Sequence, residues 1–205
     1  MSQFRKSEQL NEADMAADPI AQFQSWMADA VAAGLPRPDA MTLASATADG
    51  RPSARMLLLK GCDERGFMFF TNYRSRKARE LFANAHAALV FFWAELERQV
   101  RIEGTVSQVS AEESDAYFRI RPLESRWSAV ASPQSETVKD RAELERLIKS
   151  VREQYPAGDI PCPPYWGGFC VKPAVVEFWQ GRPGRLHDRL CYRWADRWQL
   201  SRLAP

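Results

Sequence analysis

Histidine and cysteine are scarce in this chain, which has two histidines and four cysteines among 205 residues. The cysteines are far apart and form no C-x-x-C pair, so we expect reduced thiols, not a disulfide framework or a zinc site. Two histidines cannot make a three-histidine metal centre, and no group of carboxylates has the spacing of metal ligands. The sequence therefore predicts no metal. The four cysteines are Cys62, Cys162, Cys170 and Cys191.

The chain also lacks long apolar runs and an excess of charge of one sign. Its 28 Lys and Arg residues oppose 26 Asp and Glu residues, and a formal charge of +2 argues against a protein that coats nucleic acid. Stretches such as Ala87–Ala94 fall short of the roughly 20 apolar residues that span a bilayer. No basic, apolar and small-residue succession opens the chain, so we expect no secretory signal. We expect a cytoplasmic protein without a membrane or nucleic-acid partner.

A third absence concerns dinucleotide binding. No G-x-G-x-x-G follows a predicted strand, and the chain has no regular strand–helix alternation and no internal repeat, which argues against a Rossmann fold. Short strands joined by turn signals, with helices between them, instead predict a mainly β, α+β fold: a small antiparallel barrel with peripheral helices. We expect a flexible polar tail over residues 1–17 and one domain over residues 18–205.

Capping signals locate the helices. Asp18-Pro19 predicts a helix start and Gly34 its end, and the capping box Ser110-x-x-Glu113 predicts a helix that stops before Pro122. Two more helices are predicted over 76–83 and 136–153. The hairpin signal Asp49-Gly50 joins the first two of eight predicted strands. These are 41–47, 53–60, 67–71, 87–93, 99–109, 169–179, 186–194 and 197–203, and residues 61–66 are predicted to be a turn.

One candidate site lies near the C-terminus. In an extended strand alternate side chains share a face, so Arg185, His187 and Arg189 would form one row while Leu186 and Leu190 faced the core. Such a row beside two aromatic residues is suited to an anionic, ring-shaped ligand. The alternative is a solvated edge strand.

A second candidate follows the predicted strand 67–71. Arg76 and Lys77 open a helix capped by Ser75, where cations oppose the helix dipole and therefore indicate a bound anion such as phosphate. An ordinary surface basic pair is the alternative. Arg55 and Lys60, at the ends of an apolar strand, would serve two different groups or simply reach solvent.

Other polar residues add to this picture. Tyr117, Arg121 and Ser125 combine a bidentate cation with two hydroxyl groups, a set suited to a phosphate monoester. Gln99 is an amide that both donates and accepts, and Gln134-Ser135 is most simply a helix cap. No nucleophile–base arrangement accompanies them. Many anion-binding groups without catalytic machinery of their own indicate a phosphorylated cofactor that carries the chemistry.

Several segments, in order along residues 18–205, resemble those of one family, the pyridoxine/pyridoxamine 5'-phosphate oxidases. These FMN-dependent enzymes make pyridoxal 5'-phosphate. The segments are Arg55-Met-Leu-Leu-Leu-Lys60, Gly66-Phe-Met-Phe-Phe-Thr-Asn-Tyr-Arg-Ser-Arg-Lys77, Leu96-Glu-Arg-Gln-Val100, Tyr117-Phe-x-x-Arg121-Pro, Gln134-Ser135, Pro164-Tyr-Trp-Gly-Gly-Phe169, Glu177-Phe-Trp-Gln-Gly181, Arg185-Leu-His-Asp-Arg189 and Arg202-Leu-Ala-Pro205.

This resemblance implies a split β-barrel that binds FMN, in a homodimer with FMN at the subunit interface. It places Arg185 and His187 beside the ring and the reacting carbon of the substrate, as the catalytic pair. The implied contacts with the substrate phosphate are Lys60, Tyr117, Arg121 and Ser125. The implied FMN contacts are Arg55, Met56, Leu57, Leu58, Leu59, Lys60, Phe70, Thr71, Arg76, Lys77, Gln99, Gln134, Ser135, Trp179 and Arg189.

The implied reaction is hydride transfer from C4' of pyridoxamine or pyridoxine 5'-phosphate to FMN, with O2 as the final oxidant and H2O2 as its product. Ser128 and Val130 depart from the glycine and tryptophan usual in the family, which bears on substrate affinity. Two alternatives are a split-barrel flavoprotein of another activity, such as a flavin reductase, and a non-catalytic carrier of pyridoxal phosphate. The carrier would be colourless.

Overall fold

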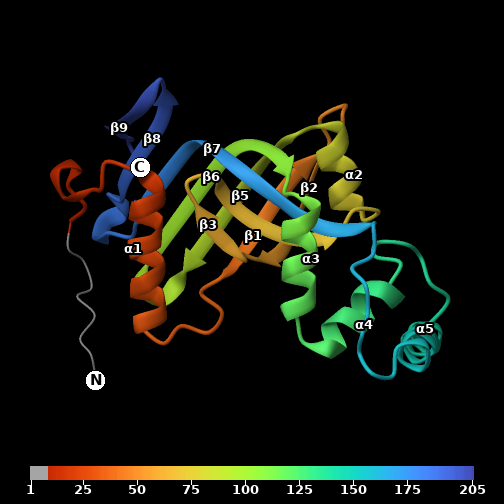
Figure 1. Cartoon of the computed structure of the whole chain (residues 1–205). Coiled ribbons are helices and arrows are strands. Elements are labelled where there is room, and N and C mark those ends of the chain that lie inside the picture. Colours follow the sequence, from red (N-terminus) through yellow and green to blue (C-terminus); the bar gives the residue numbers. More distant parts are fainter. Residues whose placement is uncertain (1–8) are drawn as a thin grey trace.

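The structure, a computed structural model, describes residues 9–205 and is built on one antiparallel sheet (Figure 1). Seven strands follow the order β2-β1-β5-β6-β7-β4-β3, and the β8–β9 hairpin joins the sheet through β7. The mainly β, antiparallel α+β architecture is therefore confirmed. The strands are β1 (Ala40–Ala46), β2 (Pro52–Leu58), β3 (Gly61–Asp63), β4 (Gly66–Asn72), β5 (His86–Trp93), β6 (Arg98–Gln108), β7 (Trp166–Gln180), β8 (Asp188–Ala195) and β9 (Arg197–Arg202).

Helices pack around this sheet. None in the described part of the chain is long and apolar enough to cross a membrane. The α-helices are α1 (Pro19–Ala32), α2 (Arg76–Ala83), α3 (Ala111–Ile120), α4 (Leu123–Ala131) and α5 (Arg141–Gln154), and the 3-10 helices are η1 (Glu12–Asp14), η2 (Ala94–Leu96) and η3 (Pro183–Arg185).

The long strand β7 connects the two parts of the sheet. Its first half pairs with β4, from Asn72↔Trp166 to Phe67↔Val171, and its second half pairs with β8. Strand β6 pairs with the opposite edge of β7, and the register of this pairing shifts between Glu103 and Gly104. A Cβ at Gly104 would lie 2.0 Å from the carbonyl oxygen of Lys172, so this close approach requires glycine.

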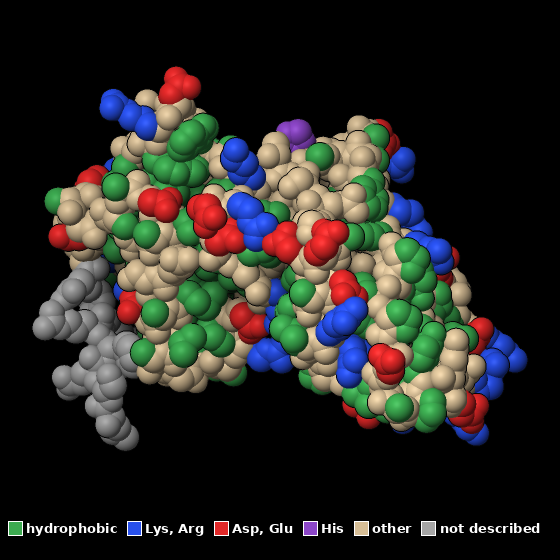
Figure 2. All heavy atoms as spheres, in the orientation of Figure 1, with side chains coloured by type: hydrophobic (Ala, Val, Ile, Leu, Met, Phe, Trp, Pro, Cys, Tyr) green, Lys and Arg blue, Asp and Glu red, His purple; other side chains and the backbone are tan. Residues whose placement is uncertain are grey.

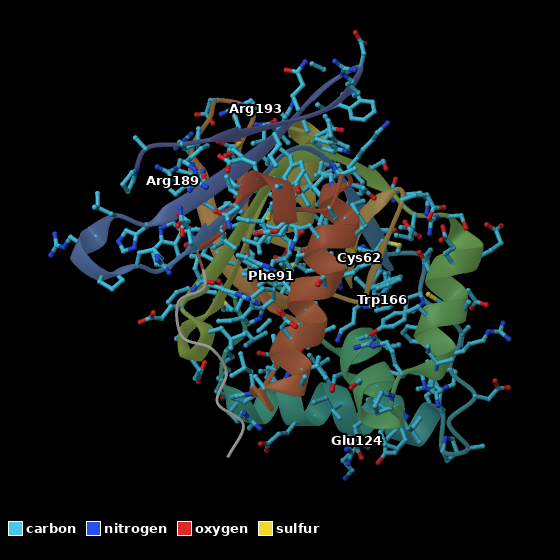
Figure 3. All side chains as sticks on the ribbon, turned by 90° about the vertical axis from the view of Figure 1, so that its left-hand side faces the viewer. Cys62, Phe91, Glu124, Trp166, Arg189 and Arg193 are labelled. Atoms are coloured by element: carbon cyan, nitrogen blue, oxygen red, sulfur yellow. The ribbon has the colours of Figure 1, made fainter. Side chains whose placement is uncertain are left out.

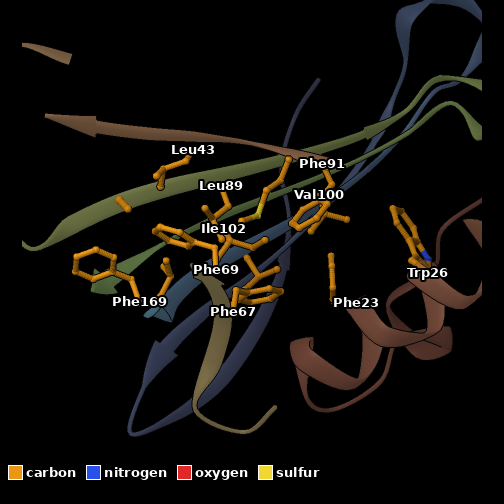
Figure 4. Close-up of a cluster of buried hydrophobic side chains, with 14 of the residues drawn as sticks. Phe23, Trp26, Leu43, Phe67, Phe69, Leu89, Phe91, Val100, Ile102 and Phe169 are labelled. Carbon is orange, nitrogen blue, oxygen red and sulfur yellow. The ribbon is translucent and has the colours of Figure 1, made fainter. Parts of the chain in front are cut away.

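The main core lies between the curled sheet and α1 (Figure 4). Phe23 on α1 packs against Phe67 and Phe91, with ring centroids 4.9 and 4.8 Å apart, and Trp26 packs against Phe178 at 5.1 Å. Each buried aromatic ring contributes about 2 kcal/mol of hydrophobic stabilisation. The predicted start of this helix is confirmed, because Asp18 caps it by accepting from the backbone N–H of Ile20.

The helical region between β6 and β7 differs from the prediction. Helix α5 begins at Arg141, not near residue 136, because Asp140 is its N-cap and accepts from the backbone N–H of Glu143 at 2.8 Å. Helix α4 was not predicted. Its residues include two serines and two β-branched or aromatic side chains with modest helix propensity, so packing against α5 and the loop after it decides its conformation. The short strand β3 lies in the segment predicted as a turn.

The predicted row of Arg185, His187 and Arg189 on one strand face is wrong. Strand β8 begins only at Asp188, since residues 183–185 form η3 and Arg185 has a φ of +63° in the left-handed region. Leu186 is therefore 75% exposed instead of buried, whereas Leu190 lies in the core as predicted.

The N-terminal segment lies beside the C-terminal hairpin. Residues 1–8 of the predicted flexible tail lie outside the described residues. Beyond them, the backbone N–H of Leu10 donates to Asp188 at 3.2 Å, and Arg202 donates to Asp188 at 2.7 Å and to Glu12 at 3.0 Å. The hydroxyl of Tyr192 donates to the carbonyl of Ala16 at 2.6 Å. Residues 9–17 are thus tied to β8 and β9.

Candidate active site

A pocket of about 590 Å³ opens between β2, the end of β4, and the helices α3 and α4. It gathers many of the residues expected to contact cofactor or substrate, although they come from distant parts of the sequence. We call it the α3–α4 pocket. Its predicted members are Met56, Leu57, Leu58, Lys60, Phe70, Thr71, Tyr117, Arg121, Ser125 and Gln134. Leu59 instead packs against the main core.

Three aromatic rings form one wall of this pocket. Phe70 of β4 stacks on Tyr117 of α3 with centroids 4.0 Å apart, and on Trp166 of β7 at 5.5 Å. The ring planes of Tyr117 and Trp166 differ by only 5°. Burial raises the pKa of Tyr117, so its hydroxyl stays protonated and can donate a hydrogen bond.

Arg121 supplies an unsatisfied cation in the same pocket. Its guanidinium lies over the Trp166 ring, 4.6 Å from the centroid, and its Nη1 is buried without a hydrogen-bond partner among the described residues. Burial lowers the pKa of Arg121. Lys60 also lines the pocket, but it donates to Asp39 at 3.2 Å. A buried donor without a partner is costly, and an anionic ligand would satisfy it.

A buried lysine adjoins the pocket at the start of α2. The ammonium of Lys77 donates to the hydroxyls of Thr71 at 3.1 Å and Ser75 at 3.3 Å, and to the side-chain oxygen of Gln134 at 3.1 Å. Burial and the positive charge of Arg55 lower the pKa of Lys77 to about 8. Ser75 caps α2 as predicted.

Gln134 is not a helix cap, contrary to the prediction. It lies in a turn before α5, and its oxygen accepts hydrogen bonds from Thr71 and Lys77. Ser135, next in this turn, has a φ of +74°. Neighbouring residues in the sequence could not have predicted this role of Gln134, because its two hydrogen-bond partners are more than 50 residues away.

Arg55 and Arg76 meet at a buried carboxylate that was not predicted, that of Glu80. Arg76 Nε donates to it at 2.8 Å and Arg55 Nη2 at 3.3 Å. With Lys77 these residues form what we call the α2 cluster, which holds three cations and one anion. Only the Arg76–Glu80 spacing of four residues was visible in the sequence as a helical ion pair.

The remaining predicted residues form a second group at the far end of β7, the β8 group: Gln99, Trp179, Arg185, His187 and Arg189. The rings of Trp179 and His187 are 4.7 Å apart. Arg189 forms a bidentate ion pair with Glu177, at 2.8 and 3.1 Å, which raises the pKa of Arg189. Glu177 is buried and also accepts from Arg101 at 3.3 Å.

The structure does not bring these two groups together within one chain. Gly167, paired with Thr71 beside the pocket, and Trp179 are 12 residues apart on β7, which is about 40 Å of strand. Figure 3 shows Arg189 on the β8 ribbon and Trp166 on the opposite side, near α3. A single small ligand cannot contact both ends of β7 in the same subunit.

Other kinds of site find no support in the described residues. They contain no group of His, Cys, Asp and Glu that could hold a metal ion. The four cysteines are free, and burial raises the pKa of Cys62 to about 12 and that of Cys170 to about 11. Acidic and basic side chains are intermingled on the face in Figure 2, without one large basic patch.

The fold and pocket define a split-barrel protein with a polar, cationic ligand site, and comparisons with known proteins give its family. Residues 27–155 match the family model described as pyridoxamine 5'-phosphate oxidase, and residues 166–205 match that of the pyridoxine 5'-phosphate oxidase C-terminal dimerisation region. The chain belongs to the pyridoxamine 5'-phosphate oxidase family.

Relatives of the chain carry the same name. A pyridoxine/pyridoxamine 5'-phosphate oxidase of Thermosynechococcus vestitus is 60% identical over 98% of this chain and 95% of its own length. One of Burkholderia multivorans is 58% identical over 96% of this chain and 93% of its own length.

Solved structures share the fold. PhzG from Burkholderia lata, in complex with tetrahydrophenazine-1-carboxylic acid, has a TM-score of 0.92 and 31% identity over 98% of this chain and 99% of its own. An FMN-binding protein of Nostoc punctiforme, related to pyridoxamine 5'-phosphate oxidase, has a TM-score of 0.73 at 20% identity, covering 93% of this chain and all of its own. The second likeness concerns the fold alone.

Proposed function

We propose that the chain oxidises pyridoxamine 5'-phosphate or pyridoxine 5'-phosphate to pyridoxal 5'-phosphate with FMN as cofactor and O2 as the final oxidant. With the amine substrate, the imine that forms is hydrolysed and ammonia is released. The observation that carries this proposal is the buried, unpartnered Nη1 of Arg121 in a pocket shared with Lys60, Tyr117 and Ser125. Two cations and two hydroxyls around one cavity are suited to a phosphate monoester. The names of the relatives at 58–60% identity agree with this substrate.

The α2 cluster is suited to the phosphate of FMN. Three cations against one carboxylate leave a net charge of +2, which balances a phosphate dianion, and the start of α2 adds its backbone N–H groups. FMN bound here would supply a two-electron acceptor that O2 can reoxidise, with release of H2O2. Arg55, Arg76 and Lys77 would hold its phosphate, and Thr71 and Gln134 would orient the lysine.

The active unit in this proposal is a homodimer. Because one chain separates the α3–α4 pocket from the β8 group by the length of β7, a complete site needs the β8 group of a second copy. The match of residues 166–205 to a dimerisation region supports this arrangement. His187 and Arg185 would then lie at the reacting carbon, and the protein's part would be to orient the substrate and exclude water.

The test is direct. The purified protein should show a flavin spectrum and, given pyridoxamine or pyridoxine 5'-phosphate in air, release pyridoxal 5'-phosphate and H2O2 in equal amounts. A yellow protein that forms neither product would disprove the proposal, and a colourless protein that binds pyridoxal phosphate would indicate a carrier.

A second candidate follows from the likeness to PhzG, whose crystals contain a tricyclic carboxylic acid. Tetrahydrophenazine-1-carboxylic acid should be supplied in parallel. Faster oxidation of this compound than of either phosphorylated substrate would favour the second candidate. We expect the opposite, because a phosphate monoester offers three terminal oxygens to the donors of Lys60, Tyr117, Arg121 and Ser125, whereas a carboxylate offers only two.

A further inference from the structure

Glu80 is the only anion of the α2 cluster, and four donors converge on its carboxylate. Ser45 and Ser53 each donate a hydroxyl hydrogen bond at 2.5 Å, Arg76 Nε donates at 2.8 Å and Arg55 Nη2 at 3.3 Å. The donors come from β1, β2 and α2. The side chain of Glu80 is only 5% exposed. This carboxylate therefore joins α2 to the sheet beside the proposed phosphate site.

The carboxylate stays charged despite its burial. Burial alone would raise the pKa of Glu80, but the hydrogen bonds from Ser45, Ser53, Arg76 and Arg55 outweigh it and lower the pKa to about 2. At neutral pH the group is thus a fixed anion with its lone pairs satisfied. A buried carboxylate held this way is a rigid acceptor for the two guanidinium groups.

The Glu80 carboxylate restrains the side chain of Arg76. Arg76 is 62% exposed, and a pair of this kind four residues apart on a helix normally holds a side chain only weakly. Here the partner is already immobilised, so less side-chain freedom remains to be lost. Since Glu80 engages Nε of Arg76, the two Nη groups are left for another acceptor.

Arg55 is held in a similar way. Its Nη1 donates to Ser45 at 2.6 Å and its Nη2 to Ser53 at 2.5 Å, and both serines donate to Glu80. The guanidinium is thereby fixed in a plane between β1, β2 and α2. Its charge lies close enough to Lys77 to lower the pKa of that lysine.

We propose that Glu80 is a positioning residue, which fixes the guanidinium groups of Arg55 and Arg76 for the phosphate of the flavin cofactor. This inference rests on the proposed function. It makes a prediction opposite in sign to that of simple charge balance. Removing the carboxylate charge raises the cluster from +2 to +3, which alone would tighten phosphate binding. Loss of positioning weakens binding instead.

The experiment compares Glu80→Gln with Glu136→Gln in cofactor-free protein. Glu136 is the matched control because it pairs with Arg79 of the same helix, at 3.1 Å, and is 55% exposed outside the cluster. The Kd for FMN and for riboflavin, which lacks the phosphate, is measured by flavin fluorescence quenching. We expect Glu80→Gln to raise the Kd for FMN about tenfold and leave that for riboflavin unchanged. Glu136→Gln should change neither.

The outcomes separate the inference from the proposed function. Failure of the wild-type protein to bind FMN would overturn both. Wild-type binding with an unchanged or lower Kd in Glu80→Gln would overturn the inference alone, as would equal weakening of FMN and riboflavin. If Glu80→Gln does not fold, Ser53→Ala replaces it, because it removes one restraint on Glu80 and Arg55 without changing charge. It should raise the Kd for FMN about threefold, and no change would count against positioning.

Discussion

The backbone N–H of Arg182 donates a hydrogen bond to Nδ1 of His187 at 3.1 Å. A ring nitrogen that accepts a hydrogen bond carries no proton, so the neutral imidazole has its proton on Nε2. The turn that begins after β7 thus sets the tautomer of His187. The Trp179 ring, 4.7 Å away, packs beside it. In the proposed active site, His187 therefore presents Nε2–H to the substrate as a hydrogen-bond donor.

This tautomer predicts different results for two amide substitutions of His187. Glutamine can place an N–H near the position of Nε2, whereas asparagine can replace only the acceptor at Nδ1. We expect His187→Gln to retain about ten times the kcat of His187→Asn, the value of one lost hydrogen bond in the transition state. Steady-state kinetics with pyridoxamine 5'-phosphate measures this ratio. Equal kcat values would show that donation from Nε2 has no role.

Arg121 offers a prediction about substrate affinity. Replacing Arg121 by Met removes a charge-assisted contact with the substrate phosphate, and we expect KM for pyridoxamine 5'-phosphate to rise about 10- to 100-fold. The flavin content should not change, since Arg121 is not in the α2 cluster. The thermal stability should change little, because the buried Nη1 has no hydrogen-bond partner to lose among the described residues and methionine can keep the contact with the Trp166 ring.

The control for this variant lies two residues earlier, in the last turn of α3. Arg119 pairs with Asp115 at 2.8 Å and is 73% exposed, so Arg119→Met should leave KM unchanged. Unphosphorylated pyridoxamine should be turned over equally poorly by wild type and Arg121→Met. A KM effect of the same size on this compound would mean that Arg121 does not recognise the phosphate.

The sequence predicts local features of this protein better than it predicts how they meet. Caps such as Asp18 and Ser75 depend on neighbouring residues and are confirmed. Glu80 depends on Ser45 and Ser53, which only the pairing of β1 with β2 and the packing of α2 bring to it. Contacts of this kind, between residues far apart in the sequence, cannot be predicted from the periodicity of apolar and polar residues.

The expected row of Arg185, His187 and Arg189 shows a second reason why prediction from the sequence fails. Alternation predicts faces only where the chain is extended, but Arg185, the first residue of the expected row, lies in η3 after the Pro183-Gly184 turn, and β8 begins only at Asp188. Arg185 then takes a positive φ, which no spacing rule would assign to an arginine. The family resemblance supplied the ligands expected for these residues, but not their conformation.

Lys77 predicts a pH dependence of cofactor binding. Its pKa in the free protein is about 8, lowered by burial and by Arg55, and the phosphate dianion requires the charged ammonium. Above pH 8 the lysine must take up a proton when FMN binds, so the Kd should rise by up to about tenfold per pH unit. Fluorescence titrations between pH 7 and 10 measure this slope. Lys77→Arg, which stays charged, should show a flat profile.

The same lysine has the opposite effect on the stability of the cofactor-free protein. In the unfolded chain its side chain has the ordinary lysine pKa of 10.5, so between pH 8 and 10.5 the unfolded state binds more protons than the folded one. The free energy of unfolding of the wild type should therefore increase with pH in this window, relative to Lys77→Met. A difference between the two proteins that does not depend on pH would contradict the lowered pKa of Lys77.

In the proposed homodimer, each active site combines the α3–α4 pocket of one protomer with the β8 group of its partner. This arrangement predicts recovery of activity in mixed dimers. Arg121→Met impairs the α3–α4 pocket and His187→Asn impairs the β8 group, so each homodimer has two defective sites. In a mixed dimer, the intact pocket of one protomer meets the intact β8 group of its partner, while the second site carries both changes. Random pairing makes half of the dimers mixed, and we expect about a quarter of the wild-type activity. The measurement is turnover at a substrate concentration well below KM, where both variants are impaired, before and after the two variants are unfolded and refolded together.

A matched pair of variants tests whether this recovery depends on location. Lys60 lines the same pocket as Arg121, so mixing Lys60→Met with Arg121→Met leaves one substitution in each pocket of every mixed dimer. That mixture should recover nothing. If both mixtures stay inactive although size-exclusion chromatography shows dimers, each site is built from a single chain. The separation of 12 positions along β7 between Gly167 and Trp179 makes that outcome the one least compatible with the described fold.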